Sequence, residues 1–172
     1  VVLVNANLGG ALLDSANLNS ANLKMAKLMG ASLLLADLTG ANLHMASLMG
    51  ADLSGATLNL ANLSRANLQM ARLMGASLRV ADLPASDLVG ADLSGADLQE
   101  ARLISANLSL SILTAANLHK ANLSFASLDR SNLALTDLSG SIIRKASLRG
   151  VNLSGANMAG ADLSDSDLSG GG

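Results

Sequence analysis

The side chains most able to bind a metal or move a proton are a run of aspartates and two histidines. The aspartates recur at intervals of five residues: Asp82, Asp87, Asp92 and Asp97. If they converged they could hold a divalent cation, and His44 with His119 could act as an acid and base or ligate zinc. No cysteine occurs, which excludes a thiol nucleophile, a thiolate metal site and a disulfide framework and leaves the redox compartment open. Whether these groups meet depends on the elements that position them.

Those elements are set by a tandem repeat of five residues. Leucine occupies every fifth position from Leu3 to Leu168, with only Ile143 and Met158 as exceptions, and alanine usually stands two positions before it. A period of five fits neither a helix nor one long strand, so we predict short extended segments joined by corners. Most of the 16 glycines lie two positions after the leucine, where a corner favours a residue that tolerates positive φ. One phenylalanine and no tryptophan or tyrosine indicate an interior too narrow for large rings.

The spacing of charged residues indicates how many repeats form one coil. Residues one coil apart lie about 4.8 Å apart, where like charges repel. At an offset of 20 residues every charged pair is opposite in sign: Asp52 with Arg72, Arg72 with Asp92, Asp82 with Arg102, Glu100 with Lys120, Asp129 with Arg149, and Lys145 with Asp165. Offsets of 15 and 25 give as many like pairs as opposite pairs. We therefore predict four repeats, or 20 residues, per coil.

This coil separates the candidate reactive groups. The four aspartates point from four different faces, and His44 and His119 lie on different faces nearly four coils apart. We therefore expect no catalytic residue, no metal site, no cofactor and no small-molecule substrate. Pro84 lacks an amide hydrogen and predicts a local bulge. A hydrogen-bonded ladder of side chains is expected from one stack of asparagines: Asn22, Asn42 and Asn62.

The segments ANLSRANLQMARLMGASL and ADLSGADLQEARL carry the pattern A(D/N)LXX. In this pattern, which covers the whole chain, the protein resembles the pentapeptide repeat family. The resemblance implies an all-β fold, a right-handed quadrilateral β-helix of about 8–9 coils, with leucine and alanine pointing inward. We expect residues 1–172 to form one uninterrupted β-helix. Because the chain begins without methionine and nothing before Val1 resembles a capping element, it could be a segment of a longer chain, or its open coil ends could meet another subunit.

Large apolar residues at outward positions are the most informative exception to the repeat. They are Met25, Met29, Met45, Met49, Leu34, Leu35, Met70, Met74 and Phe125. Met25 and Met45 stack in one corner column, and Met29 and Met49 stack on the following face. Contiguous exposed apolar surface usually marks a contact, and methionine suits an adaptable one. We predict that these residues bind a protein partner or a second copy of the chain.

The leading functional interpretation is a non-catalytic scaffold that mediates protein–protein contacts and is not an enzyme. The alternative is a DNA-mimicking modulator of a type II topoisomerase, gyrase, which some members of the family resemble in width and charge. This chain departs from that branch because its net charge is only −2 and no loop interrupts the repeat. The weak field also argues against nucleic acid as a partner. No run of about 18 apolar residues occurs, so we expect no transmembrane segment.

Overall fold

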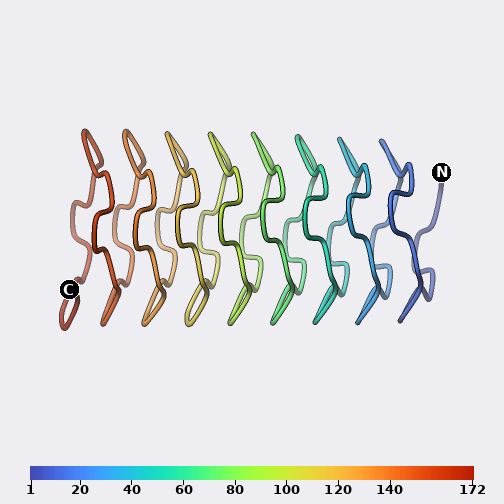
Figure 1. The fold of residues 1–172 in the computed structure, drawn as a ribbon, viewed down its shortest axis with the longest axis horizontal. Helices are drawn as coiled ribbons and strands as arrows, with labels where there is room; N and C mark the ends of the chain where they lie inside the picture. The colour runs from blue at the N-terminus through green and yellow to red at the C-terminus, as the bar shows by residue number, and fades with distance from the viewer.

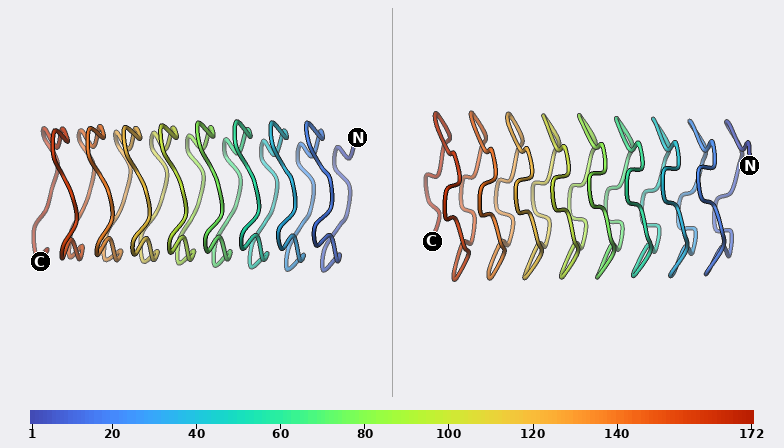
Figure 2. Two further views of the ribbon diagram at one scale, coloured as in Figure 1. Left: turned by 45° about the horizontal axis from the view of Figure 1, so that its top comes forward. Right: turned by 90° about the horizontal axis from the view of Figure 1, so that it is seen from above.

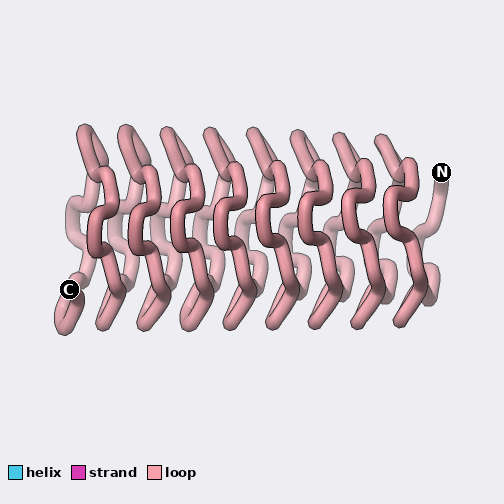
Figure 3. The backbone as a smooth tube through the Cα atoms, in the orientation of Figure 1, coloured by secondary structure: helices cyan, strands magenta, loops and turns pink.

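The computed structural model describes all 172 residues, which wind into a straight rod with one terminus at each end (Figure 1). The backbone contains no helix and no extended strand, and the tube in Figure 3 is therefore drawn throughout as loop. Successive coils are instead joined by single parallel bridges, and each bridge links residues 20 positions apart, from Val2 with Asn22 to Ser147 with Asp167. The predicted coil of four repeats is confirmed, and the three views in Figures 1 and 2 show the same coil repeated along the rod.

Each repeat ends in a tight turn that forms one corner. The amide of the residue three positions after a central leucine donates to that leucine's carbonyl, as Ala26 does to Leu23 at 3.0 Å. The residue two positions after the leucine has positive φ at every corner, whether it is Gly30 at 62° or Met25 at 57°. Positive φ costs a non-glycine residue roughly 1 kcal/mol or more. The next coil holds the corner in place, because Met25 N donates to the carbonyl oxygen of His44 at 2.9 Å.

The interior of the rod is a stack of leucines and alanines. Every central residue from Leu23 to Leu148 is at most 1% exposed, whereas Leu168 in the last coil is 39% exposed. Where a hydroxyl residue replaces the inward alanine, it donates to a carbonyl, as Ser86 Oγ does to Leu83 at 2.8 Å. Burying a hydroxyl is tolerated only with such a partner. The structure contains no apolar helix long enough to cross a bilayer.

The predicted bulge at Pro84 is wrong. Leu83 and Ala85 both donate to the next coil as their counterparts elsewhere do, and the carbonyl of Pro84 accepts from Arg65 at 3.0 Å. Pro84 occupies the second position of its turn, where the coil-to-coil ladder uses no amide and where the fixed φ of proline is favoured. The ladder therefore passes Pro84 without interruption.

The predicted ladder of Asn22, Asn42 and Asn62 is also wrong in its pairing. The side chain of each asparagine accepts from the backbone amide two residues further on, such as Ser64 N to Asn62 Oδ1 at 3.0 Å. This Asx-type bond stabilises the turn within one coil. Side-chain ladders between coils occur in other columns, for example Asn152 Nδ2 to Asn132 Oδ1 at 3.0 Å.

Candidate functional site

Four methionines form the clearest exposed apolar group, and we call Met25, Met29, Met45 and Met49 the methionine strip. Met25 and Met45 stand one above the other at one corner and are 45% and 46% exposed, and Met29 and Met49 on the adjoining face are 46% and 36% exposed. Bridges between Asn22 and Asn42 and between Lys27 and Ser47 hold these two coils in register. Methionine side chains therefore repeat at the coil spacing of about 4.8 Å.

The other predicted contact residues are also exposed, but they do not all join the strip. Met70 lies at the far edge of the same face, whereas Met74 and Leu34 lie on the next face and Leu35 on the corner diagonally opposite Met25. Phe125 shares the corner column of Met45 but stands four coils further along, roughly 19 Å away. The predicted set is thus one strip with several separate exposures around the rod.

Some of these side chains lean along the rod onto a glycine of the next coil. A Cβ built at Gly90 would lie 2.7 Å from Met70 Sδ, and one built at Gly55 would lie 2.7 Å from Leu35 Cδ2. The same addition at Gly50, beside Met49, would meet nothing within 4 Å. A glycine corner can therefore act as a seat, a place where an apolar side chain of the preceding coil rests, as at Gly55 and Gly90. The corner at Gly50, next to the methionine strip, is an empty seat.

A second feature is a shallow groove of about 690 Å³ at the corner that carries Phe125. Lys145 Nζ lies 5.8 Å from the ring centroid of Phe125, a cation–π contact at an exposed site. Ile142 and Arg144 complete one wall, and Arg144 Nη2 pairs with Asp162 at 2.6 Å. Phe125 and Lys145 share a column because they are 20 residues apart, but the groove was not predicted. Ile142, an apolar residue in a column of mostly polar ones, was the available signal.

Of the six opposite-sign pairs at an offset of 20, three are ion pairs. They are Asp52 with Arg72 at 3.8 Å, Asp82 with Arg102 at 3.1 Å, and Asp129 with Arg149 at 3.5 Å. The other three pairs lie one coil apart without forming an ion pair: Arg72 with Asp92, Glu100 with Lys120, and Lys145 with Asp165.

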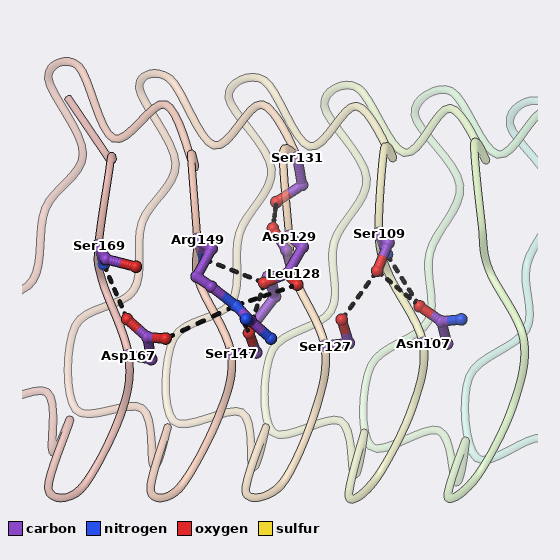
Figure 4. A network of polar contacts seen from close by, with 10 residues as sticks. All are labelled: Asn107, Ser109, Ser127, Leu128, Asp129, Ser131, Ser147, Arg149, Asp167 and Ser169. Carbon is purple, nitrogen blue, oxygen red and sulfur yellow. Dashed lines mark hydrogen bonds and ion pairs between the residues drawn. The ribbon is translucent and has the colours of Figure 1, made fainter.

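Three further ion pairs join residues 18 positions apart: Arg79 with Asp97, Arg144 with Asp162, and Arg149 with Asp167. In each of them the side chain after the central residue of a repeat (Leu78, Ile143 or Leu148) crosses to the side chain before the central residue of the next coil. Figure 4 shows this diagonal pattern, in which Arg149 reaches Asp129 on one side and Asp167 on the other.

The four aspartates considered as metal ligands lie on four separate faces, and three of them bind the turn that follows them. Asp87, Asp92 and Asp97 each accept from the backbone amide two residues further on, at 3.0 to 3.2 Å. Asp82 lacks this bond because the residue two positions on is Pro84, and it pairs with Arg102 instead. These oxygens point to different sides of the rod and do not converge on a cation.

Other polar groups are likewise engaged by the coil. His44 Nδ1 lies 2.7 Å from Ser64 Oγ, and His119 Nδ1 lies 2.8 Å from Ser139 Oγ, in each case one coil away. Bonds from the hydroxyl and amide of Ser164, with the guanidinium of Arg144 beside them, lower the pKa of Asp162 to about 2. Hydrogen bonds to a carboxylate favour its charged form. The site thus combines an exposed apolar strip with polar side chains that already bind one another.

Comparison with known proteins agrees with this architecture. The model for pentapeptide repeats matches residues 1–33, 26–55, 50–79, 76–114, 96–134, 116–155 and 131–170. HetL, a pentapeptide repeat protein involved in heterocyst differentiation regulation from the cyanobacterium Nostoc sp. strain PCC 7120, is 37% identical, with a TM-score of 0.67 over 99% of this chain and 84% of that one. Rfr23 from the cyanobacterium Cyanothece 51142 is 34% identical, with a TM-score of 0.53 over 54% of this chain and 63% of that one.

A more distant structure and the curated proteins add less. QnrB1, a plasmid-mediated fluoroquinolone resistance protein, is 23% identical, with a TM-score of 0.56 over 84% of this chain and 70% of that one, and shows the fold alone. The comparison with curated proteins finds no significant match. With its repeats matched from end to end and its backbone a right-handed quadrilateral β-helix, the chain belongs to the pentapeptide repeat family, whose members are generally structural or interaction proteins.

Proposed function

We propose that this chain is a non-catalytic interaction scaffold, a rigid β-helical rod that binds another protein through the methionine strip. The observation that carries the proposal is the pairing of Met25 with Met45 and of Met29 with Met49 in consecutive coils, all of them exposed. Of the outward-pointing residues, only Lys27 and Ser47 lie between the two methionine columns. Flexible thioether side chains on a fixed lattice can fit the surface of a partner while the backbone stays unchanged.

The rigidity of the rod supports a presenting role. In the interior coils most amides of a repeat donate either to its own turn or to a neighbouring coil, as Leu28 does to Ser47 at 2.7 Å and Lys27 does to Ala6 at 2.8 Å. Each coil contacts only its two neighbours, which is the arrangement that repeat proteins use to build long binding surfaces. The positions of side chains relative to one another are therefore set before a partner arrives, and less conformational entropy is lost on binding.

The alternative, a DNA-mimicking modulator of gyrase, has less support. A mimic of the phosphate backbone needs regular uncompensated negative charge, because double-stranded DNA carries one charge per roughly 1.7 Å of its axis. In this rod six aspartates are paired with arginines, among them Asp52, Asp82 and Asp97. Ion pairing on the surface cancels the field that such mimicry requires.

The proposal is tested by removing one methionine column and comparing it with a matched column elsewhere. Met25→Ser with Met45→Ser removes a stacked exposed pair at one corner, and Leu60→Ser with Val80→Ser removes a stacked exposed pair at another. Serine already occupies both corner columns, at Ser105 and Ser20, with positive φ. We expect a protein co-purified with the chain from its native host to be retained by the Leu60 and Val80 variant and lost from the methionine variant. Equal retention by both variants would refute the proposal.

A further inference from the structure

The face that carries Met29 and Met49, which we call the second face, has two different halves. Its central leucines run from Leu8 and Leu28 to Leu148 and Leu168. In the C-terminal half, polar side chains bind one another from coil to coil: Ser109 Oγ lies 2.8 Å from Ser127 Oγ, and Arg149 Nε lies 3.5 Å from both Asp129 and Asp167 (Figure 4). This half therefore satisfies its own polar and charged groups.

The N-terminal half of the second face has one such contact, from Gln69 Nε2 to Asp87 at 2.6 Å, and leaves its first coils without any. Met29 and Met49 are exposed, and the corner seat at Gly50 is empty. Lys27 and Asp87 occupy the same column, three coils apart, and neither takes part in any ion pair of the rod. The Asp87 carboxylate accepts hydrogen bonds from Gln69 Nε2 and Val89 N, so its negative charge has no cation beside it. Two opposite charges roughly 14 Å apart on a rigid lattice cannot reach each other within one chain.

We propose that two copies of this chain bind through the N-terminal halves of their second faces, with the rods antiparallel. The inference rests on the proposed function, since it names the partner of the methionine strip. The two copies are related by a two-fold axis that lies in the plane of the interface and runs perpendicular to the rods. Each column then lies opposite the same column of the partner, and the coils of the partner run in the reverse order. With the axis between the coils of Ser47 and Asn67, each Lys27 faces the other copy's Asp87.

The same register places Met49 opposite Gln69 and sets an apolar side chain opposite Met29. Met29 faces Val89, and the Gly50 corner faces the corner of Met70, whose side chain lies against Gly90 of its own chain. A parallel pair would instead place Lys27 against Met29, and shifting the antiparallel pair by one coil would place Lys27 against Asn67. This register combines an apolar pair with two charge pairs. Charge complementarity of this kind selects register and orientation.

The experiment exchanges the two charges and measures self-association by sedimentation velocity over a range of concentrations. Lys27→Glu creates two like-charge contacts per dimer, and we expect the dissociation constant of the dimer to rise about tenfold. The double variant Lys27→Glu with Asp87→Lys should regain the original dissociation constant. An equimolar mixture of Lys27→Glu chains and Asp87→Lys chains should also associate, because both contacts then join opposite charges. Unchanged circular dichroism establishes that the variants fold.

Two results would overturn the inference. One is a chain that stays monomeric at every concentration, and the other is a double variant that associates no better than Lys27→Glu alone. Either outcome is distinct from failure of the proposed function, which is judged separately by whether the methionine variant loses a partner from the host. Retention of a different host protein by the methionine strip, with a monomeric chain, would refute the homodimer and leave the scaffold function intact.

Discussion

Replacing Leu73 with alanine should remove about 3 to 4 kcal/mol from the free energy of unfolding. Leu73 lies in the middle of the rod, is 0% exposed, and stacks between Leu53 and Leu93. Losing three carbon atoms forfeits about 2.4 kcal/mol of transfer free energy at about 0.8 kcal/mol per methylene. The cavity that remains adds about 1 kcal/mol or more. It cannot close, because Leu73 N to Asp92 O and Leu53 N to Arg72 O, both 2.7 Å, fix the spacing of the coils.

Urea unfolding followed by far-ultraviolet circular dichroism measures this loss, since the chain has no tryptophan or tyrosine for fluorescence. Met74→Ala is the matched control, because the neighbouring side chain is 41% exposed and its removal should cost less than about 1 kcal/mol. The difference between the two variants isolates burial from position in the chain. A Leu73→Ala variant no less stable than the Met74→Ala variant would show that the coils collapse around the cavity and that the interior is not rigid.

Two further predictions concern a corner and a carboxylate. Gly90→Ala should destabilise the rod more than Gly75→Ala does. Both corners have positive φ, but only at Gly90 would the new Cβ lie 2.7 Å from Met70 Sδ. In a Met70→Ala background the difference in melting temperature between the two variants should vanish, and a difference that persists there would contradict this explanation. The pKa of Asp162 is lowered to about 2 from 3.8, so its stabilising contribution is complete above pH 3.8 and is lost as pH falls toward 2. Between about pH 4 and 2 the melting temperature of the Asp162→Asn variant should therefore fall less than that of the unmodified chain. If the two melting temperatures fell in parallel with pH, the Asp162 carboxylate would not stabilise the rod in this way.

The sequence was sufficient for the fold because one rule governs every coil. Leucine and alanine at fixed positions specify which side chains point inward, and Asp82 with Arg102 or Asp129 with Arg149 report the coil length because stacked charges must be compatible. The errors came from side chains whose contacts depend on turn geometry. Pro84 fits its turn because no ladder bond needs its amide, and Asn62 binds within its own turn, to the amide of Ser64, instead of the asparagine above it.

The candidate site was less accessible to sequence reasoning. Exposure of Met29 and Met49 followed from the repeat, but the diagonal ion pair of Arg79 with Asp97 did not, because a search at multiples of five residues never samples an offset of 18. On the second face the diagonal contact of the same kind is Arg149 with Asp167, which pairs the charges of its C-terminal half. The empty seat at Gly50 likewise depends on which way the side chains lean along the rod, and this is visible only in coordinates.

The most direct measurement of the central claim is methyl NMR of the chain labelled at its seven methionines. Unlabelled chain, which we infer to be the partner, is added in increasing amounts. The resonances of Met29 and Met49 should shift or broaden with added chain, whereas those of Met74 on the next face and Met158 near the rod's end should not. Changes confined to Met74 or Met158, or seven resonances that remain unaltered at every concentration, would contradict the assignment of the second face as a contact surface between copies.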